Sequence, residues 1–152
     1  MATVLGDEID VLAKAKRAIA GDYLPGDGES YMSEAQLDYY RRLLQEWKKL
    51  IVSAAQDTLQ SLQDGPIREP DLNDRASSET DWGIELRTRD RQRKLIAKID
   101  SALRRIEEGE YGYCEVTGEP IGLGRLSARP IATMTVEAQE AHERREKISR
   151  DD

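Results

Sequence analysis

The stretch LDYYRRLLQEWKKLIVSA, residues 37–54, decides the fold of this chain. Its apolar side chains recur at alternating spacings of three and four residues, as Leu37, Tyr40, Leu44, Trp47, Ile51 and Ala54. This spacing places one apolar seam along a helix and is typical of two helices that pack along their length. The stretch therefore predicts a long helix that pairs with a partner helix. Tyr40 and Trp47 lie on this seam, so we interpret them as packing residues.

Capping and turn signals define the two ends of this helix. Ser33 and Gln36 form a capping-box pattern, in which the Ser33 side chain accepts from the Gln36 amide while the Gln36 side chain reaches back. Gly65 and Pro66 end the pattern, because proline lacks an amide donor and disfavours helical geometry in the residue before it. We therefore expect a helix over residues 34–63.

A second helical pattern supplies the partner. It begins between Asp74 and Ser78 and runs to Glu108, where Gly109 is a suitable terminator. Its apolar seam is strongest in the C-terminal half, in Leu95, Ile96, Ile99, Leu103 and Ile106. Toward the connection the seam weakens, and Gly83 costs about 1 kcal/mol relative to alanine inside a helix. We therefore expect an antiparallel hairpin whose distal end opens more readily than its base.

The remaining segments predict a small globular part beside the hairpin. Residues 1–32 hold a short helix at about 8–20 and a turn-rich stretch, and residues 110–134 interleave glycine and proline with apolar side chains. Thr135 is a candidate N-cap for a last helix to about Ser149, which we expect to cover the 110–134 segment. The expected fold class is mainly α: a long antiparallel coiled-coil hairpin over 33–109 with its tip near 69–76, an N-terminal segment of 1–32 packing on a globular part that includes 110–134, and a C-terminal helix within 135–152.

Composition excludes several classes of function. The 152 residues carry 30 Asp and Glu against 23 Lys and Arg, a formal net charge of -7, so phosphate backbones repel this surface and free DNA or RNA is not the expected partner. No run approaches the roughly 20 apolar residues of a membrane span, and the N-terminus lacks the order of a secretory signal, so we expect a cytoplasmic protein. We also expect it to be a monomer. The single Cys114 supplies one of the about four ligands that a structural zinc site requires. We therefore expect neither a metal nor a disulfide.

Two aspartates, Asp71 and Asp74, lie three residues apart where the second helix begins. Their ordinary role is helix capping, since aspartate favours N-caps and first-turn positions. The functional alternative is a probe, in which two carboxylates held far from the body reach a metal ion or a basic group in another protein. The pair lacks the further fixed ligands of a catalytic metal centre, so we expect no enzyme activity.

A basic stripe follows on the second helix, where Arg87, Arg91, Lys94 and Lys98 share one side at about 100° per residue. A solvated face and a face that binds an anion or an acidic partner both explain it. On an acidic chain, the stripe favours a specific acidic partner over general nucleic-acid affinity. His142 has no neighbouring ligand set, so we interpret it as a surface histidine.

Four further segments stand out together: Asp71-x-x-Asp74-x-Ala76, Glu85-Leu-Arg-x-Arg-Asp-Arg-x-Arg-Lys-Leu-Ile96, Tyr111-Gly-Tyr-Cys-Glu115 and Arg125-Leu-x-Ala-Arg-Pro130. In this order they resemble the DksA family, and the resemblance covers about residues 29–148. Members of this family insert a coiled coil into the secondary channel of bacterial RNA polymerase. There the tip acts near the active-site Mg²⁺ and alters open-complex stability, in cooperation with the alarmone ppGpp. The resemblance implies a non-enzymatic regulator of transcription initiation that takes part in the stringent response.

The resemblance also assigns residues. The tip residues that act on polymerase are Asp71, Asp74 and Ala76. The residues that contact the rim of the channel are Arg87 and Arg91. The residues that help to form a ppGpp site at the polymerase interface are Leu95, Lys98 and Arg129.

Two departures from the family pattern qualify these assignments. The family's four-cysteine zinc knuckle keeps only Cys114, because Thr117, Thr135 and Ala138 stand at the other three positions. We expect zinc binding to be lost and the fold to be insensitive to zinc shortage and thiol oxidation. The packing expected to replace the metal involves Tyr113, Val116, Ile121, Leu126, Ile131 and Val136.

The second departure is Gln139, which stands where the family often has a lysine near ppGpp. Loss of that cation should weaken ppGpp binding, because charge-assisted contacts contribute about 1.5–3 kcal/mol each. The sequence alone does not decide whether ppGpp acts.

Three other functions fit parts of the pattern. A cleavage factor of the Gre type also uses an acidic tip, to promote hydrolysis of backtracked RNA by polymerase. A plain coiled-coil adaptor with no active tip fits the periodicity equally well. A phosphohydrolase is the weakest alternative, because Asp71 and Asp74 lack a third ligand or a base. Promoter preference, affinity for polymerase, the role of the first 30 residues and the existence of a zinc-containing paralogue are not encoded in these patterns.

Overall fold

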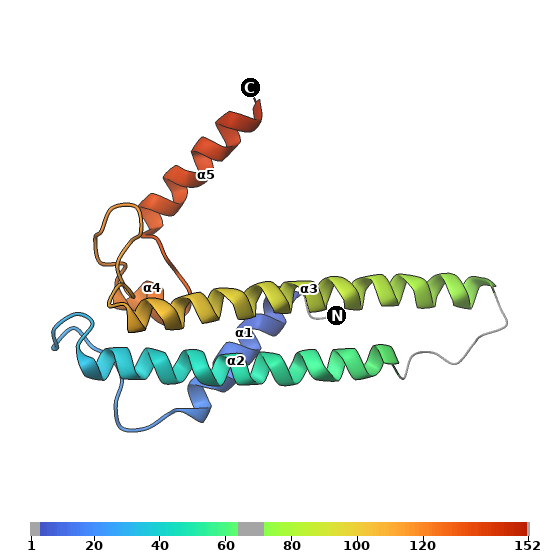
Figure 1. The fold of residues 1–152 in the computed structure, drawn as a ribbon, viewed down its shortest axis with the longest axis horizontal. Coiled ribbons are helices and arrows are strands. Elements are labelled where there is room, and N and C mark those ends of the chain that lie inside the picture. The colour runs from blue at the N-terminus through green and yellow to red at the C-terminus, as the bar shows by residue number, and fades with distance from the viewer. Residues whose placement is uncertain (1–3, 64–71, 152) are drawn as a thin grey trace. The chain divides into compact units, whose positions relative to one another are not determined.

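The fold is mainly helical, as the apolar spacing predicts. The computed structural model describes the backbone of residues 4–63 and 72–151, and the side chains of residues 10–57, 60 and 80–149. The helices in this part are α1 (Val4–Ala18), α2 (Glu34–Gln63), α3 (Leu72–Glu107), α4 (Leu123–Ala128) and α5 (Val136–Asp151) (Figure 1). Over the same residues there is no β-strand, and one isolated antiparallel bridge joins Tyr113 and Pro120. None of the described helices is both long enough and apolar enough to cross a membrane.

The chain divides into two compact units. The first comprises Met1–Ala20 and Gln45–Ile99, and the second comprises Gly21–Leu44 and Asp100–Asp152. Helices α2 and α3 therefore each contribute to both units. Both tryptophans belong to the first unit, and all six tyrosines belong to the second.

In the first unit, residues 45–63 of α2 and 72–99 of α3 run in opposite directions (Figure 1). Trp47 and Ile51 are buried on α2, and Leu95 and Ile99 are buried on α3, each pair being four residues apart. The face of α1 that carries Leu12 and Ala15 is also buried. Burial of such one-sided apolar faces is the main source of stability for helices of this kind. The antiparallel pairing expected from the seam is present, and Trp47 is a packing residue.

In the second unit, the base of the same two helices is more tightly packed. Tyr40, Leu43 and Leu44 of α2 are completely buried, and the Arg41 guanidinium Nε lies 3.5 Å from Glu107 Oε1 on α3. The α3 seam continues through Ala102 and Ile106, which are buried, whereas Leu103 is only half-buried. Leu103 lies at the edge of the seam and not at its centre, because it is turned about 40° from Ile99 and about 100° from Ala102.

The start of α2 confirms the capping pattern with one change. The Gln36 amide donates to Ser33 Oγ at 3.3 Å, as expected. The Gln36 side chain accepts from the Met32 amide at 2.7 Å, one residue before the cap, because the Ser33 amide already donates to the Ser30 carbonyl. Gln36 Nε2 also donates to the Gly26 carbonyl at 3.2 Å. The completely buried Gln36 therefore ties the turn-rich segment before α2 to the helix.

The end of α3 is set by Gly109, as the sequence predicts. Gly109 has a φ of 76°, a conformation that favours glycine, and its amide donates to the Ile106 carbonyl. The next amide, that of Glu110, donates to the Arg105 carbonyl at 2.9 Å. These two bonds form a Schellman motif that satisfies the last carbonyls of the helix.

The other helices differ from expectation mainly at their ends. Helix α1 begins at Val4 and stops at Ala18, where the Ala20 amide bonds three residues back to Arg17 and tightens the last turn. Helix α4 was not expected from the sequence. It is only six residues long, too short to show a helical pattern among the glycines and the proline around it. Helix α5 starts at its expected cap, since the Ala138 amide donates to Thr135 Oγ1 at 3.2 Å.

Candidate functional site

The first unit presents a basic stretch of α3 to solvent. The expected stripe residues Arg87, Arg91, Lys94 and Lys98 are all exposed. Lys94 Nζ lies 3.3 Å from Asp90 Oδ2 one turn earlier, and both side chains are more than half exposed, so this pair adds little stability. The Thr88 hydroxyl donates to the Ile84 carbonyl at 3.0 Å and thus serves the helix itself. The stripe therefore lies on the surface.

The expected tip residues lie at the start of α3. Helix α3 begins at Leu72, directly after Asp71, and places Asp74 in its first turn and Ala76 in its second. Asp71 and the side chains of Asp74 and Ala76 lie outside the described residues. The assignment of these three residues stays a prediction.

The residues expected to hold ppGpp have different surroundings. Leu95 is buried and Lys98 is exposed, both in the first unit. Arg129 is exposed in the second unit, at the end of α4, where its amide donates to the Arg125 carbonyl at 2.7 Å. Gln139 Nε2 donates to Glu143 Oε1 at 3.1 Å within α5. A joint ppGpp site stays a prediction.

The second unit contains a compact loop structure, residues 110–138, which we call the knuckle. Its first turn is closed by two backbone bonds of 2.8 Å, from the Cys114 amide to the Glu119 carbonyl and from the Gly118 amide to the Cys114 carbonyl. Gly118 has a φ of 76°. The Glu115 amide donates to the Thr133 carbonyl at 2.9 Å, which joins this turn to the segment before α5. The knuckle thus brings together two turns that are about 20 residues apart.

Polar interactions involve all four positions at which the family carries its zinc-binding cysteines, namely Cys114, Thr117, Thr135 and Ala138. Burial by itself raises the pKa of the Cys114 thiol, but bonds from the Thr117 side chain and from the amides of Thr117, Thr135 and Val116 lower that pKa to about 7. The Thr117 hydroxyl accepts in turn from the Glu119 amide at 3.2 Å. The Thr135 hydroxyl accepts from Ala138, the fourth position. The neighbouring N–H and O–H groups therefore favour the thiolate form of Cys114.

The residues at these positions do not fit a zinc ion. Structural zinc in proteins takes four ligands, usually cysteine thiolates and histidine nitrogens. Here Cys114 is the one thiol, the threonine hydroxyls are neutral, and Ala138 has no donor atom. Among the described residues, no group of three or more His, Cys, Asp or Glu side chains could hold a metal ion.

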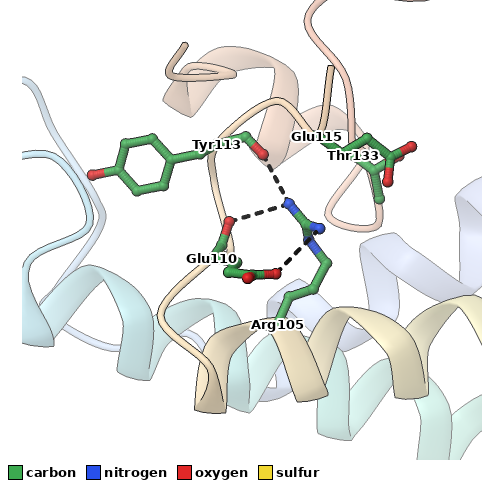
Figure 2. A network of polar contacts seen from close by, with 5 residues as sticks. All are labelled: Arg105, Glu110, Tyr113, Glu115 and Thr133. Atoms are coloured by element: carbon green, nitrogen blue, oxygen red, sulfur yellow. Dashed lines mark hydrogen bonds and ion pairs between the residues drawn. The ribbon is translucent and has the colours of Figure 1, made fainter. Parts of the chain in front are cut away.

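Arg105 joins the end of α3 to the knuckle (Figure 2). Its Nη2 donates to the Glu110 carbonyl at 3.2 Å and to the Tyr113 carbonyl at 2.8 Å, and its Nη1 lies 3.9 Å from Glu110 Oε2. The Thr133 hydroxyl Oγ1 also donates to Glu115 Oε1 at 3.2 Å, which joins the two knuckle turns. A largely buried guanidinium with several carbonyl acceptors is a strong, oriented crosslink.

Tyrosine hydroxyls make the other crosslinks. Tyr31, from the segment before α2, donates to the Gly112 carbonyl at 2.6 Å and accepts from the Gly122 amide at 2.9 Å. Tyr111 is buried and donates to the Pro130 carbonyl at 2.7 Å. The Tyr40 ring lies against Tyr111 with 5.7 Å between centroids, so α2 also covers the knuckle.

Two expectations about the knuckle are therefore wrong. Helix α5 does not cover it, because residues 142–149 of α5 are exposed; the segment before α2 and α2 itself do so instead. Val116 and Val136 do not replace the metal by packing, since they are 58% and 45% exposed. The buried apolar side chains of the knuckle are Tyr111, Cys114, Ile121, Leu126, Pro130, Ile131 and Ala132. His142 is a surface residue, as expected, with its Nε2 3.1 Å from Glu146 Oε1.

Sequence reasoning missed Arg105 and Tyr31 as structural residues of the knuckle. Arg105 lies on α3 among charged residues that resemble a solvated face. Tyr31 lies 81 and 91 residues before its two partners, so local patterns carry no trace of the contact. The two glycines Gly112 and Gly122 were the sequence feature that could have indicated this contact. Both have a positive φ, and the absence of a side chain lets another segment approach their backbone closely.

The chain matches two family models that together span most of its length. The model described as DnaK suppressor protein DksA, N-terminal domain, matches residues 36–106. The model described as prokaryotic dksA/traR C4-type zinc finger matches residues 109–144. The second match includes the knuckle, whose ligand positions differ from the C4 pattern as described above.

Individual proteins are similar over nearly the whole chain. The RNA polymerase-binding transcription factor DksA of Caulobacter vibrioides is 60% identical over 131 residues, which cover 86% of this chain and 92% of the relative. The protein of the same name from Escherichia coli K12 is 43% identical over 132 residues, covering 86% and 87%. The solved structure of transcription factor DksA2 from Pseudomonas aeruginosa superposes with a TM-score of 0.71 at 39% identity, covering 92% of this chain and 98% of that one. With this identity over this length, the chain belongs to the DksA family.

Proposed function

We propose that this protein binds bacterial RNA polymerase through the secondary channel and regulates transcription initiation. The observation that carries the proposal is the basic stretch of α3 between residues 87 and 94, where five basic side chains accompany one acidic side chain on a chain of net charge -7. Such a surface attracts an acidic protein partner, whereas the chain as a whole repels free nucleic acid. Relatives of this chain are named RNA polymerase-binding transcription factors, which supports the same partner.

In this proposal the protein acts in the cytoplasm as a monomer, without binding DNA directly and without catalysing a reaction. The tip residues Asp71, Asp74 and Ala76 act near the polymerase active site. The residues that contact the rim are Arg87 and Arg91. The residues that bind ppGpp at the polymerase interface, during the stringent response, are Leu95, Lys98 and Arg129.

We also propose that the knuckle folds without zinc. The two bonds between Glu115 and Thr133 support this, because they join the turn that carries Cys114 to the segment that leads to Thr135. The bonds from Arg105, Tyr31 and Tyr111 fix other parts of the knuckle. Purified protein should contain no stoichiometric zinc by elemental analysis, and EDTA should leave its unfolding midpoint unchanged. Loss of structure on chelation would contradict the proposal.

The test of the proposed function is transcription in vitro from a ribosomal RNA promoter, with and without ppGpp. The wild-type protein should reduce transcription. Asp74→Asn removes one charge without changing shape, so it should bind polymerase normally and fail to alter transcription. Asp81→Asn is the matched control, because Asp81 is an exposed aspartate two turns further along α3 and should keep full activity. An active Asp74→Asn protein would refute the tip assignment.

The same wild-type and variant proteins distinguish the proposed regulator from a transcript-cleavage factor and from a coiled-coil adaptor. Added to stalled elongation complexes, a cleavage factor shortens the backtracked transcripts, whereas the proposed regulator leaves their length unchanged. For an adaptor with no active tip, both aspartate variants and the wild type would behave identically in every transcription assay.

A further inference from the structure

Two consecutive residues of the segment before α2 contact the same glycine of the knuckle. The Tyr31 hydroxyl donates to the Gly112 carbonyl at 2.6 Å. A Cβ added to Gly112 would lie 2.6 Å from Met32 Sδ, 2.8 Å from its Cγ and 3.3 Å from its Cε. The thioether of Met32 therefore occupies the place that a side chain at position 112 would take. We call the contact of Tyr31 and Met32 with Gly112 the clasp.

Met32 has an unfavourable backbone conformation. Among the residues that the structure describes, it is the one non-glycine residue with a positive φ, which is 55°. Such a conformation persists only where the surrounding contacts impose it. At Met32 these contacts are the thioether against Gly112 and the amide, which donates to Gln36 Oε1 at 2.7 Å. Loss of the thioether contact therefore favours a change of backbone conformation at this residue.

The Met32 thioether is a group that peroxides oxidise. Hydrogen peroxide transfers one oxygen atom to the sulfur: the O–O bond breaks, an S–O bond forms, the sulfur gives up two electrons and water is released. The product, methionine sulfoxide, is polar and disrupts packed contacts. The Met32 side chain is half-buried, so solvent reaches part of it.

Two neighbouring donors are already used by other acceptors. Gln36 Nε2 donates to the Gly26 carbonyl at 3.2 Å, and the Tyr31 hydroxyl donates to the Gly112 carbonyl. A sulfoxide oxygen packed against Gly112 would therefore take a donor from an existing bond or remain without one, and both outcomes weaken the clasp.

We propose that Met32 is a peroxide-sensitive modification site, whose oxidation to the sulfoxide opens the clasp and releases the segment before α2 from the knuckle. The inference goes beyond the proposed function and does not depend on polymerase binding. The response needs neither the Cys114 thiol nor a metal ion. Because sulfoxide reductases restore the thioether, the change is reversible.

The test treats the purified full-length protein with hydrogen peroxide and then with a thiol reductant. The reductant reverses sulfenic acid and disulfide formation at Cys114 but leaves methionine sulfoxide in place. Peptide mass mapping should find an added oxygen on Met32, and the urea midpoint should fall. The Gly122 amide donates to the Tyr31 hydroxyl at 2.9 Å, so its hydrogen exchange should become about tenfold faster once the clasp opens.

Two variants treated in the same way separate Met32 from the other sulfur atoms. Met32→Leu cannot be oxidised at this position, so peroxide should leave its midpoint and its Gly122 exchange unchanged. Met134→Leu is the matched control, because Met134 is also half-buried and lies in the knuckle itself. This variant should lose stability on oxidation as the wild type does.

A reductase measurement tests the inference even if Met32→Leu folds poorly. Oxidised Met134→Leu protein is incubated with the sulfoxide reductases for both epimers, and its midpoint and Gly122 exchange should return to their values before oxidation. Reduction of Met32 without any recovery would contradict the inference.

Three other results would also overturn it. Met32 could stay unoxidised at peroxide concentrations that oxidise Met134. Oxidised Met32 could leave both the midpoint and the Gly122 exchange unchanged. A well-folded Met32→Leu could lose as much stability on treatment as the wild type. None of these results concerns polymerase binding, so the proposed function would stand in each case.

Discussion

The knuckle and the distal part of α3 use polar contacts in opposite ways. In the knuckle, side chains bond to partners far along the chain, as Tyr31 does to Gly112 and Gly122, 81 and 91 residues away. On α3 between residues 84 and 94, the bonds of Thr88 and Lys94 reach only one turn back. Long-range bonds fix one conformation, whereas local bonds leave the outward surface available. The comparison shows that tertiary bonds hold the knuckle, whereas the bonds of Thr88 and Lys94 on the distal helix are local to that helix.

The largest expected effect breaks the knuckle at Gly112. A Cβ on this residue would lie 2.6 Å from Met32 Sδ, and its φ of 90° is unfavourable for other residues. Gly112→Ala should therefore lower the free energy of unfolding by about 2–5 kcal/mol, combining backbone strain with overpacking. Urea unfolding measures this change in the free energy of unfolding. Gly118→Ala is the control, because Gly118 has a φ of 76° but a Cβ added there would meet nothing within 4 Å. This variant should lose only the part of the stability that comes from backbone strain. Equal losses would show that the Met32 contact is unimportant.

The next effect tests the tyrosine crosslinks. Tyr111→Phe leaves the buried Pro130 carbonyl without its 2.7 Å donor and should cost about 1–3 kcal/mol. Burial, with Tyr40 and Tyr31 nearby, raises the pKa of Tyr111 well above its ordinary value of 10.0. As the pH rises, the unfolded chain therefore loses the Tyr111 proton before the folded protein does. The contribution of this group to the free energy of unfolding is fully present below pH 10 and falls above it, by about 1.4 kcal/mol per pH unit. Urea unfolding between pH 9 and 11 should show a shallower fall for Tyr111→Phe, and an unchanged slope would contradict the assignment.

A smaller effect is expected at Cys114, at a pH closer to neutral than that of the Tyr111 effect. Its pKa of about 7 in the folded protein lies below the ordinary value of 9.0, despite the opposing effect of burial, because hydrogen bonds favour the thiolate. Stability should therefore rise between about pH 7 and 9 and be lost as the pH falls through 7. Cys114→Ser should remove this rise. The measurement is urea unfolding across pH 6 to 9, and a rise that survives the substitution would assign it to another group.

The smallest effect sharpens the description of the distal helix. A Cβ at Gly83 would meet only the end of the flexible Arg87 side chain, at 4.0 Å. Gly83→Ala should stabilise this part of α3 by about 1 kcal/mol, because alanine loses less backbone entropy on helix formation. Hydrogen exchange of the amides in residues 84–90 should slow, while that of the knuckle stays the same. Faster exchange in α3 would show that Gly83 has a packing role.

The helices were predictable where local chemistry decides them. The bounds of α2, Glu34–Gln63, agree with those inferred from Ser33 and from the Gly65-Pro66 pair. Gly109 and Thr135 mark the end of α3 and the start of α5 for the same reason. Each of these signals acts within four or five residues, so the sequence carries it completely.

The knuckle was not predictable in detail, because its contacts join segments far apart in the chain. Val116 and Val136 look like core residues by composition, but their exposure depends on which segment covers the knuckle. That segment contains Tyr31, and its position follows from the tertiary bonds to Gly112 and Gly122. The expected loss of zinc ligands came from resemblance to a family, whereas the bonds that hold Cys114 required coordinates.

The distribution of aromatic residues gives the molecule two built-in optical reporters. Both tryptophans lie in one unit and all six tyrosines in the other. Indole fluorescence excited at the red edge of absorption therefore follows the unit with the helical pair, while the tyrosine bands of the second-derivative ultraviolet spectrum follow the tyrosine-rich unit. Unfolding of the two parts can thus be followed separately in one unlabelled sample, and the order in which they melt can be measured directly.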